Sequence, residues 1–161
     1  MLENNSDKDR LSAVDAGMDA RSSIVEARTE NMPRRPIRSF LDLEVYQNTY
    51  KASILVMTEI IPRLPKNEYY DLVDQIRRAC KAVPRLIAEG YSKKHQNKGF
   101  QKYLDDSLAE SNEMIVCLCH VRDLYGRYVD KEKVDNLIDQ YDKSSRQLYK
   151  LSRRWQDFKS R

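Results

Sequence analysis

The chain has 161 residues, 40% of them apolar and 34% charged, which is enough for one hydrophobic core beneath a heavily charged surface. Its four glycines and five prolines argue against a turn-rich β-sandwich and favour long helices. The formal net charge of +4 permits an acidic partner but does not require one, so the distribution of the basic residues matters more than their sum.

The first 38 residues differ in composition from the rest. They carry seven acidic and seven basic residues, few large apolar residues, and the helix-breaking run from Met32 to Pro36. We therefore expect residues 1–38 to form a disordered N-terminal arm and residues 39–161 to form the folded domain. The remaining 22 basic and 18 acidic residues lie in that domain, so the net charge belongs to it.

The N-terminus lacks the basic segment followed by an apolar segment that marks a secretory signal. No apolar run approaches the length of about 18 residues that indicates a membrane-spanning helix. The three cysteines, an odd number, are typical of reduced thiols rather than of a disulfide framework. We expect a soluble, cytoplasmic protein.

Helical spacing of apolar residues begins directly after the arm. Ser39 can cap a helix, and Asp42 falls in the first turn, where the helix dipole favours a carboxylate. The apolar residues that then follow at steps of three and four are Leu43, Tyr46, Tyr50, Ile54, Met57 and Ile61. This spacing predicts a first helix with that face inward. Pro62 and Pro65 end it, and the short loop predicts an antiparallel neighbour.

A second helix is predicted from about Glu68 to Ala88, with Gly90 as its C-terminal cap. Its apolar residues are Leu72, Ile76, Ala79, Val83 and Ile87. Pro84 lies inside it and costs about 3 kcal/mol in a helix interior, because proline lacks an N–H and clashes with the carbonyl four residues earlier. We expect a bend there that wraps the helix around the core.

Two further helices complete the pattern. The third is predicted from Phe100 to Tyr125, ended by Gly126, and the fourth begins near Asp130. Their inward-facing residues are Phe100, Leu104, Leu108, Ile115, Leu118, Val121, Val134, Leu137, Tyr141, Leu148, Leu151, Trp155 and Phe158. No segment sustains a period of two. The predicted fold class is all-α, an antiparallel up-down four-helix bundle.

The basic residues of the second helix form a stripe opposite its apolar face. Arg78, Lys81 and Arg85 point outward on a helical wheel. Asp74 precedes Arg78 by four residues and Glu89 follows Arg85 by four, a spacing that predicts ion pairs worth about 0.2–0.5 kcal/mol each. The stripe is either a solvated, salt-bridged face or a surface that meets phosphates or another subunit.

The segment LVDQIRRACKAVPRLIAEG, residues 72–90, resembles a signature of the 23S rRNA intervening-sequence protein family, approximately L-x-x-Q-I-R-R-A-x-x-S-I-P-x-N-I-A-E-G. The matching residues are Leu72, Gln75, Ile76, Arg77, Arg78, Ala79, Pro84, Ile87, Ala88, Glu89 and Gly90. FLDLEVYQ, residues 40–47, resembles the F-x-D-L-x-V-W-Q start of the family. On the third helix the matches are Phe100, Tyr103, Leu104 and Glu113.

The chain departs from the family pattern at positions on two helices. Ala82 and Leu86 replace a serine and an asparagine on the second helix. On the third helix, Ser107, Ala109 and Glu110 stand where Ala, Gly and Ser are usual. These third-helix positions hold small contact residues, so helix packing or subunit contact can differ here.

The resemblance implies a non-enzymatic bundle that assembles into a homopentamer. A related group of pentameric bundles, the accessory variability determinants of diversity-generating retroelements, binds nucleic acid and a reverse transcriptase. The resemblance also implies structural or interface roles for five residues, namely Gln75, Pro84, Glu89, Gly90 and Glu113. Glu89 and Glu113 are candidates for buried tethers to Arg77 or Arg78.

Basic residues concentrate in two further places. The link after the second helix carries Lys93, Lys94, Lys98 and Lys102 and no acid. From Lys143 to Arg161 there are seven basic residues and one acid, including Arg153 and Arg154, with aromatic residues interleaved. This pattern suits RNA or single-stranded DNA, through phosphate pairing and base stacking. The alternative is that the aromatic residues belong to the core and the charges are solvated.

The sequence offers little for an active site or a metal. Cys117 and Cys119 point about 200° apart on a helix and cannot bind one ion together, so both are interpreted as core residues. Only two histidines are present, no phosphate-binding glycine motif occurs, and no cofactor is predicted. A metal-dependent or hydrolytic enzyme is therefore the least favoured hypothesis.

Two other hypotheses remain open. The first is a homo-oligomer that binds nucleic acid, RNA in particular, through its basic faces. Its candidate contacts are Arg77, Arg78, Lys81, Arg85, Lys93, Lys94, Lys98, Lys102, Arg153 and Arg154. The second is a protein-interaction scaffold, such as a reverse transcriptase partner, with residues 1–38 as the docking segment.

Overall fold

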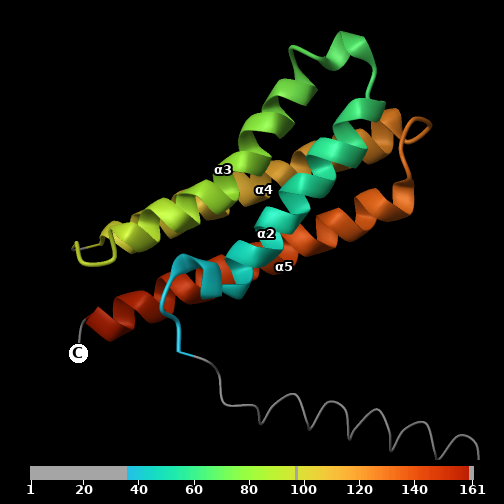
Figure 1. Ribbon diagram of the computed structural model, residues 1–161. Coiled ribbons are helices and arrows are strands. Elements are labelled where there is room, and N and C mark those ends of the chain that lie inside the picture. Colours follow the sequence, from blue (N-terminus) through green and yellow to red (C-terminus); the bar gives the residue numbers. More distant parts are fainter. Residues whose placement is uncertain (1–35, 97, 160–161) are drawn as a thin grey trace, which may run out of the picture. The chain divides into compact units, whose positions relative to one another are not determined.

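The computed structural model describes residues 36–96 and 98–159, with side chains to Trp155. The predicted arm lies outside the described residues except for Pro36, Ile37 and Arg38, and so does the side chain of Phe158. Four main helices run through the described part: α2 (Glu44–Leu55), α3 (Leu72–Ser92), α4 (Gly99–Tyr125) and α5 (Lys131–Lys159). Their antiparallel course is visible in Figure 1, and it confirms the predicted four-helix bundle.

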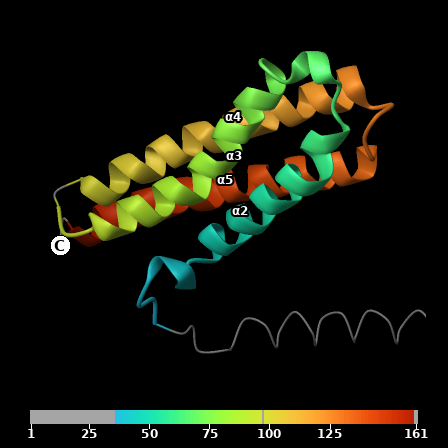
Figure 2. The same ribbon diagram turned by 45° about the horizontal axis from the view of Figure 1, so that its top comes forward.

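The bundle pairs its helices in a ring of neighbours. α4 packs against α3 and α5, and α2 packs against the same two helices. The core contains fully buried side chains from every helix, among them Ala52, Ile76, Leu104 and Tyr141. Because α2 and α4 share neighbours rather than facing each other, their outward surfaces lie on different sides of the bundle (Figure 2).

The first helix begins later than predicted. Ser39 does act as a cap, but for a 3₁₀ turn, Phe40–Asp42, whose backbone ends before α2 starts at Glu44. The Ser39 hydroxyl accepts from the Leu41 N–H, and the Asp42 carboxylate accepts from the Ser39 N–H at 2.8 Å. The backbone N–H groups of Ser39 and Arg38 both donate to the Asp42 carboxylate and hold its pKa below the usual value. A π-helical turn, Val56–Ile60, and a 3₁₀ turn, Ile61–Arg63, extend α2.

The predicted inward face of this first helix is partly wrong. Tyr50 and Ile54 are 50% and 47% exposed, whereas Thr49 and Ala52 are fully buried. The smaller side chains let α2 approach α3 and α5 closely, so the large apolar residues are left along the outer flank. The π turn follows these residues, and its i→i+5 bonds shift the residues after Leu55 away from the 3.6-residue register.

Helix α3 begins and ends about four residues later than predicted. The residues before it form a 3₁₀ turn, Lys66–Glu68, where the Glu68 carboxylate accepts from the Tyr125 hydroxyl at 2.5 Å. That contact fixes the loop to the end of α4. Pro84 is buried inside α3, and the helix changes direction along its length in Figures 1 and 2, as expected of a proline-containing helix.

Gly90 does not cap the helix, so that prediction is wrong. It lies inside α3, buried, and a Cβ at this position would come 2.5 Å from the Cβ of Tyr103 on α4. Glycine is therefore required here by the close approach of two helices. The helix continues to Ser92, whose hydroxyl donates to the Glu89 carbonyl at 2.6 Å.

Buried serines connect α4 to its neighbours. The Ser107 hydroxyl donates to the Val83 carbonyl on α3 at 3.0 Å, and the Ser111 hydroxyl donates to the Tyr141 carbonyl on α5 at 3.2 Å. Ser107 is one of the departures from the family pattern, and its hydroxyl makes a hydrogen bond that alanine would lack. Asp130 accepts from the Lys133 N–H at 3.2 Å just before α5, which begins where the fourth helix was predicted to begin.

Candidate nucleic-acid interface

The basic stripe of α3 is largely engaged by groups of the same chain. Arg78 pairs with Asp74 at 3.2 Å and Arg85 pairs with Glu89 at 3.5 Å, which confirms both predicted ion pairs. All four side chains are substantially exposed, so each pair contributes little to stability. Because these charges are already compensated, phosphates would gain less here than from an uncompensated stripe.

The two remaining cations of α3, Arg77 and Lys81, have different surroundings. Arg77 is half-buried, and its guanidinium lies 4.6 Å from the centre of the Tyr69 ring. Lys81 is exposed at the edge of an apolar groove between α2 and α3. Arg77 is therefore held by a cation–π contact. The stripe is not one continuous basic surface.

That groove, here called the flank groove, has a volume of about 480 Å³. Its lining residues are Phe40, Tyr46, Tyr50, Ser53, Ile54, Met57, Lys81, Pro84, Arg85 and Ala88. The large apolar residues displaced from the core of α2 thus gather beside Pro84. An exposed apolar groove rimmed by charges is typical of a protein-interaction surface.

Lys93 forms an internal link at the C-terminal end of α3. Its ammonium group pairs with Glu89 at 3.1 Å and contacts the Tyr103 hydroxyl, which itself donates to Glu89 at 2.9 Å. The hydrogen bonds from Lys93 and then Tyr103 lower the pKa of Glu89, and those to Tyr103 and Glu89 raise the pKa of Lys93. Glu89 therefore joins α3 to α4 through Tyr103.

The two glutamates that were predicted to be buried partners of Arg77 or Arg78 make other contacts. Glu89 contacts Arg85 and Lys93, not Arg77 or Arg78. Glu113 is exposed, and the acid beside the arginines is Glu110, where the charges of Arg85 and Arg78 act on the carboxylate. Burial and the neighbouring Glu113 nevertheless raise the pKa of Glu110 overall. Gln75 donates to Asp71 at 3.0 Å on the exposed side of α3.

The other lysines of the link are more accessible. Lys94 is half-buried, with its ammonium group 4.0 Å from the centre of the Tyr91 ring. Lys98 has a left-handed backbone, with φ of 56°, at the residue that precedes α4. Lys98 and Lys102 share a shallow hollow with Asp105 and Asp106. The link sequence contains no acid, but the first turns of α4 supply two.

The C-terminal part of α5 lies at the same end of the bundle. Ser152 donates to Asp105 on α4 at 2.8 Å, while Arg153 and Arg154 are exposed. Five cations thus surround this end and are called the basic end: Lys94, Lys98, Lys102, Arg153 and Arg154. The two segments are about 50 residues apart in sequence. They come together because the end of α3 and the end of α5 lie at the same end of an antiparallel bundle.

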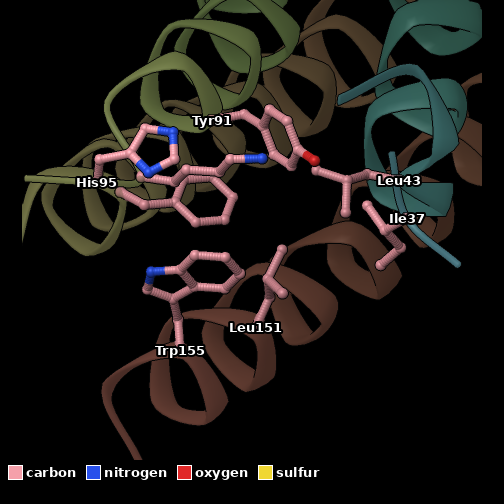
Figure 3. Close-up of a pocket in the computed structure, with 8 residues that line it drawn as sticks. Ile37, Leu43, Tyr91, His95, Leu151 and Trp155 are labelled. Atoms are coloured by element: carbon pink, nitrogen blue, oxygen red, sulfur yellow. The ribbon is translucent and has the colours of Figure 1, made fainter. Parts of the chain in front are cut away.

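A second cavity, here called the end pocket, opens at the basic end. It has a volume of about 480 Å³ and is lined by Ile37, Leu43, Tyr91, Lys94, His95, Phe100, Leu151 and Trp155. Figure 3 shows Trp155 and Leu151 on one side and Tyr91 and His95 opposite, with Leu43 and Ile37 at the side of the opening. The Phe100 and Trp155 rings meet edge to face, with centroids 4.8 Å apart.

A comparison of the sequence with models of known protein families shows which family the chain belongs to. The sequence model of the family described as 23S rRNA-intervening sequence protein matches residues 41–150, more than half of the chain. The chain belongs to this family. The match covers α2, α3, α4 and most of α5. Comparisons with curated proteins and with solved structures gave no match.

The cysteines of this family member are buried or half-buried. Burial raises the pKa of the Cys80 and Cys117 thiols to about 11, so both stay protonated at neutral pH. Cys119 is half-buried. Among residues 36–96 and 98–159, no group of three His, Cys, Asp or Glu side chains is arranged to hold a metal ion. In the same part of the chain, no helix combines the length and apolar character needed to cross a membrane.

Sequence reasoning missed both cavities of the bundle. Trp155 and Phe100 were assigned to inward faces, and Phe100 is indeed buried, but Trp155 is half-buried beside an open cavity. The signal that could have found the end pocket is the proximity of Tyr91, Phe100 and Trp155 at helix ends that an antiparallel bundle brings together.

Proposed function

We propose that this protein is a non-enzymatic homo-oligomer, a pentamer by family resemblance, that binds RNA through its basic end. The observation that carries the proposal is the convergence of Lys94 and Lys98 from the α3–α4 link with Arg153 and Arg154 from α5. None of these four has an ion-pair partner among the contacts of the described residues. Such cations can pair with phosphates without first breaking an internal ion pair.

Self-association is supported by two separate apolar surfaces. Tyr50 and Ile54 are exposed along the flank groove, and Val116 and Leu124 on α4 are 54% and 66% exposed. α2 and α4 face different sides of the bundle, so one copy can place its α4 surface against the flank groove of the next. A head-to-tail contact of this kind forms a closed ring when the rotation from one copy to the next divides a full turn evenly. Symmetry would then repeat the basic end around the ring.

The test has two parts on the full chain. Light scattering after size exclusion gives the mass, which we expect to be a multiple of the 19.0 kDa monomer. Tyr50→Lys with Ile54→Lys should reduce it to one monomer. Lys51→Gln with Lys66→Gln changes exposed residues outside the groove and should leave it unchanged. A monomeric parent protein would contradict the self-association proposal.

Binding is then measured with a labelled structured RNA and a DNA duplex, each at low and at physiological salt. We expect tight, salt-sensitive binding of the RNA, because phosphate contacts release counterions. No binding of either nucleic acid at low salt would contradict the nucleic-acid function.

A second candidate function is a scaffold for another protein, such as a reverse transcriptase. The flank groove favours it, since an apolar groove can accept a foreign helix as well as a second copy. Residues 1–38 would be the docking segment. A scaffold would keep its oligomeric mass, bind no RNA at low salt, and lose its partner when that segment is removed.

A further inference from the structure

The end pocket has the lining that a flat aromatic ring requires. Tyr91, Phe100 and Trp155 come from three different helices, and contacts between the rings hold them in place. Tyr91 and Phe100 also meet edge to face, with centroids 5.9 Å apart. The volume of about 480 Å³ lies within the range of about 300–1,000 Å³ usual for small-ligand sites. A planar ring could enter and contact the exposed part of Trp155.

The charge at the opening indicates what the ring would carry. Lys94 and His95 are the polar lining residues, and none of the eight lining residues is acidic. The Lys94 ammonium group lies on the Tyr91 ring at the wall of the pocket, where it can meet an anionic group attached to a bound ring. The complementary ligand is therefore an aromatic ring with a neighbouring negative charge, the chemistry of a base and its phosphate.

The surroundings of the pocket favour a base within a strand over a free nucleotide. Arg153 and Arg154 directly precede Trp155 on α5 and are exposed, and Lys98 lies in the same link as Lys94 and His95. These cations lie beyond the lining of the pocket, so a single nucleotide would leave them unused. A strand that inserts one base would place its flanking phosphates near them.

We propose that the end pocket receives one unpaired base of a bound RNA, stacked on Trp155, with the adjacent phosphate at Lys94. The proposal rests on the RNA-binding function proposed above and specifies its substrate: RNA with an unpaired segment rather than a continuous duplex. Sequence preference is not part of it, because stacking accepts any base.

Trp155 is the only tryptophan of the chain, so its fluorescence reports directly on the pocket. The probes are a hairpin RNA with an unpaired loop, a fully paired RNA duplex of equal charge, and adenosine monophosphate alone. We expect the hairpin to quench Trp155 fluorescence and to bind roughly tenfold more tightly than the duplex, the size of a stacking contribution. The nucleotide alone should not quench at concentrations that saturate the hairpin.

Two variants separate stacking from general attraction, and both are compared with an exposed aromatic control. Trp155→Leu should weaken hairpin binding roughly tenfold and leave duplex binding unchanged. Tyr149→Leu alters a 57% exposed aromatic residue of α5 outside the pocket and should change neither. Lys94→Gln tests the phosphate contact without changing the rings, so it also serves if Trp155→Leu proves unstable in a thermal melt. It should reduce quenching at fixed hairpin concentration.

The outcomes distinguish this proposal from the one it rests on. Equal, salt-sensitive binding of hairpin and duplex without quenching would keep the RNA-binding function and overturn the base pocket. Absence of binding by either RNA would overturn both. Quenching by adenosine monophosphate but not by the hairpin would assign the pocket to a free nucleotide and overturn the proposal. Fluorescence changed only by an added peptide of residues 1–35 would assign it to the chain itself and also overturn it.

Discussion

The hydroxyl of Ser145 on α5 donates a hydrogen bond to the hydroxyl of Ser111 on α4, over a distance of 2.9 Å. Both side chains are buried, and Ser111 donates onward to the Tyr141 carbonyl at 3.2 Å. This connected pair is a buried polar link between α4 and α5. A buried network in which each member is satisfied holds two helices in one register.

Loss of this link should destabilise the protein measurably. Ser145→Ala leaves the Ser111 hydroxyl without its incoming bond and should lower the free energy of unfolding by about 1 kcal/mol. Ser144→Ala is the matched control, because the Ser144 hydroxyl donates only within its own helix, to Gln140 at 2.8 Å. Both substitutions gain the same helix propensity, but the control breaks no hydrogen bond between helices and should therefore lose less. Urea denaturation measures both, and equal losses would argue against the interhelix role.

Gly90 allows a direct test of the close approach between α3 and α4. In an ordinary helix interior, Gly→Ala raises the free energy of unfolding by about 0.5–1 kcal/mol. At Gly90 the new methyl would lie 2.5 Å from the Tyr103 Cβ, so Gly90→Ala should instead lower it by about 1–3 kcal/mol. Chemical denaturation gives the sign. A stabilised variant would show that the helices do not meet here.

The Tyr141 hydroxyl is buried and has no hydrogen-bond partner among the described residues, and burial raises its pKa. Tyr141→Phe removes the hydroxyl and keeps the ring, so we expect the free energy of unfolding to stay equal or to rise by about 1 kcal/mol. Tyr141→Ala also removes the ring and should cost about 3–5 kcal/mol. A Phe variant that is destabilised by more than about 1 kcal/mol would reveal a partner for the hydroxyl.

Acid should weaken the Glu89 link. The pKa of Glu89 is lower in the folded protein than its ordinary value of 4.5, so the link stabilises the fold above that value and is lost as the pH falls through the folded pKa. The pKa of Lys93 is raised above its ordinary value of 10.5 in the folded protein. The stability that Lys93 contributes is therefore lost at alkaline pH, as the pH rises above 10.5. Thermal melts of the parent and of Glu89→Gln should differ at pH 7, and the difference should shrink as the pH falls below 4.5. A constant difference would contradict this linkage.

The presence of the four helices could be predicted from the sequence, because apolar residues recur every three or four positions on the buried face of a helix. The bounds of α4 shifted by one residue, and the ion pairs of Arg78 and Arg85 followed from their spacing of four. The inward face of α2 could not be predicted the same way. Small residues such as Ala52 face the core there, and choosing them over Tyr50 depends on how closely three helices approach.

The candidate site was predicted as a set of charges but not as an arrangement. A count of cations could not show that Lys93 is held by Glu89 and Tyr103 while Lys94 faces a pocket. Both outcomes depend on contacts between α3 and α4 that neither helix specifies alone. The position of Trp155 between core and opening has the same origin, because it is set by the rings of other helices.

Binding of RNA at the basic end is tested most directly by the salt dependence of its affinity. For the parent protein, the logarithm of the binding constant should fall steeply with the logarithm of the salt concentration. Arg153→Gln with Arg154→Gln should flatten that slope by about 1.4, which is about 0.7 for each lost contact to a single strand. The control, Arg63→Gln with Lys66→Gln in the α2–α3 connection, should keep the parent slope. Equal slopes for all three proteins would contradict RNA binding at this end.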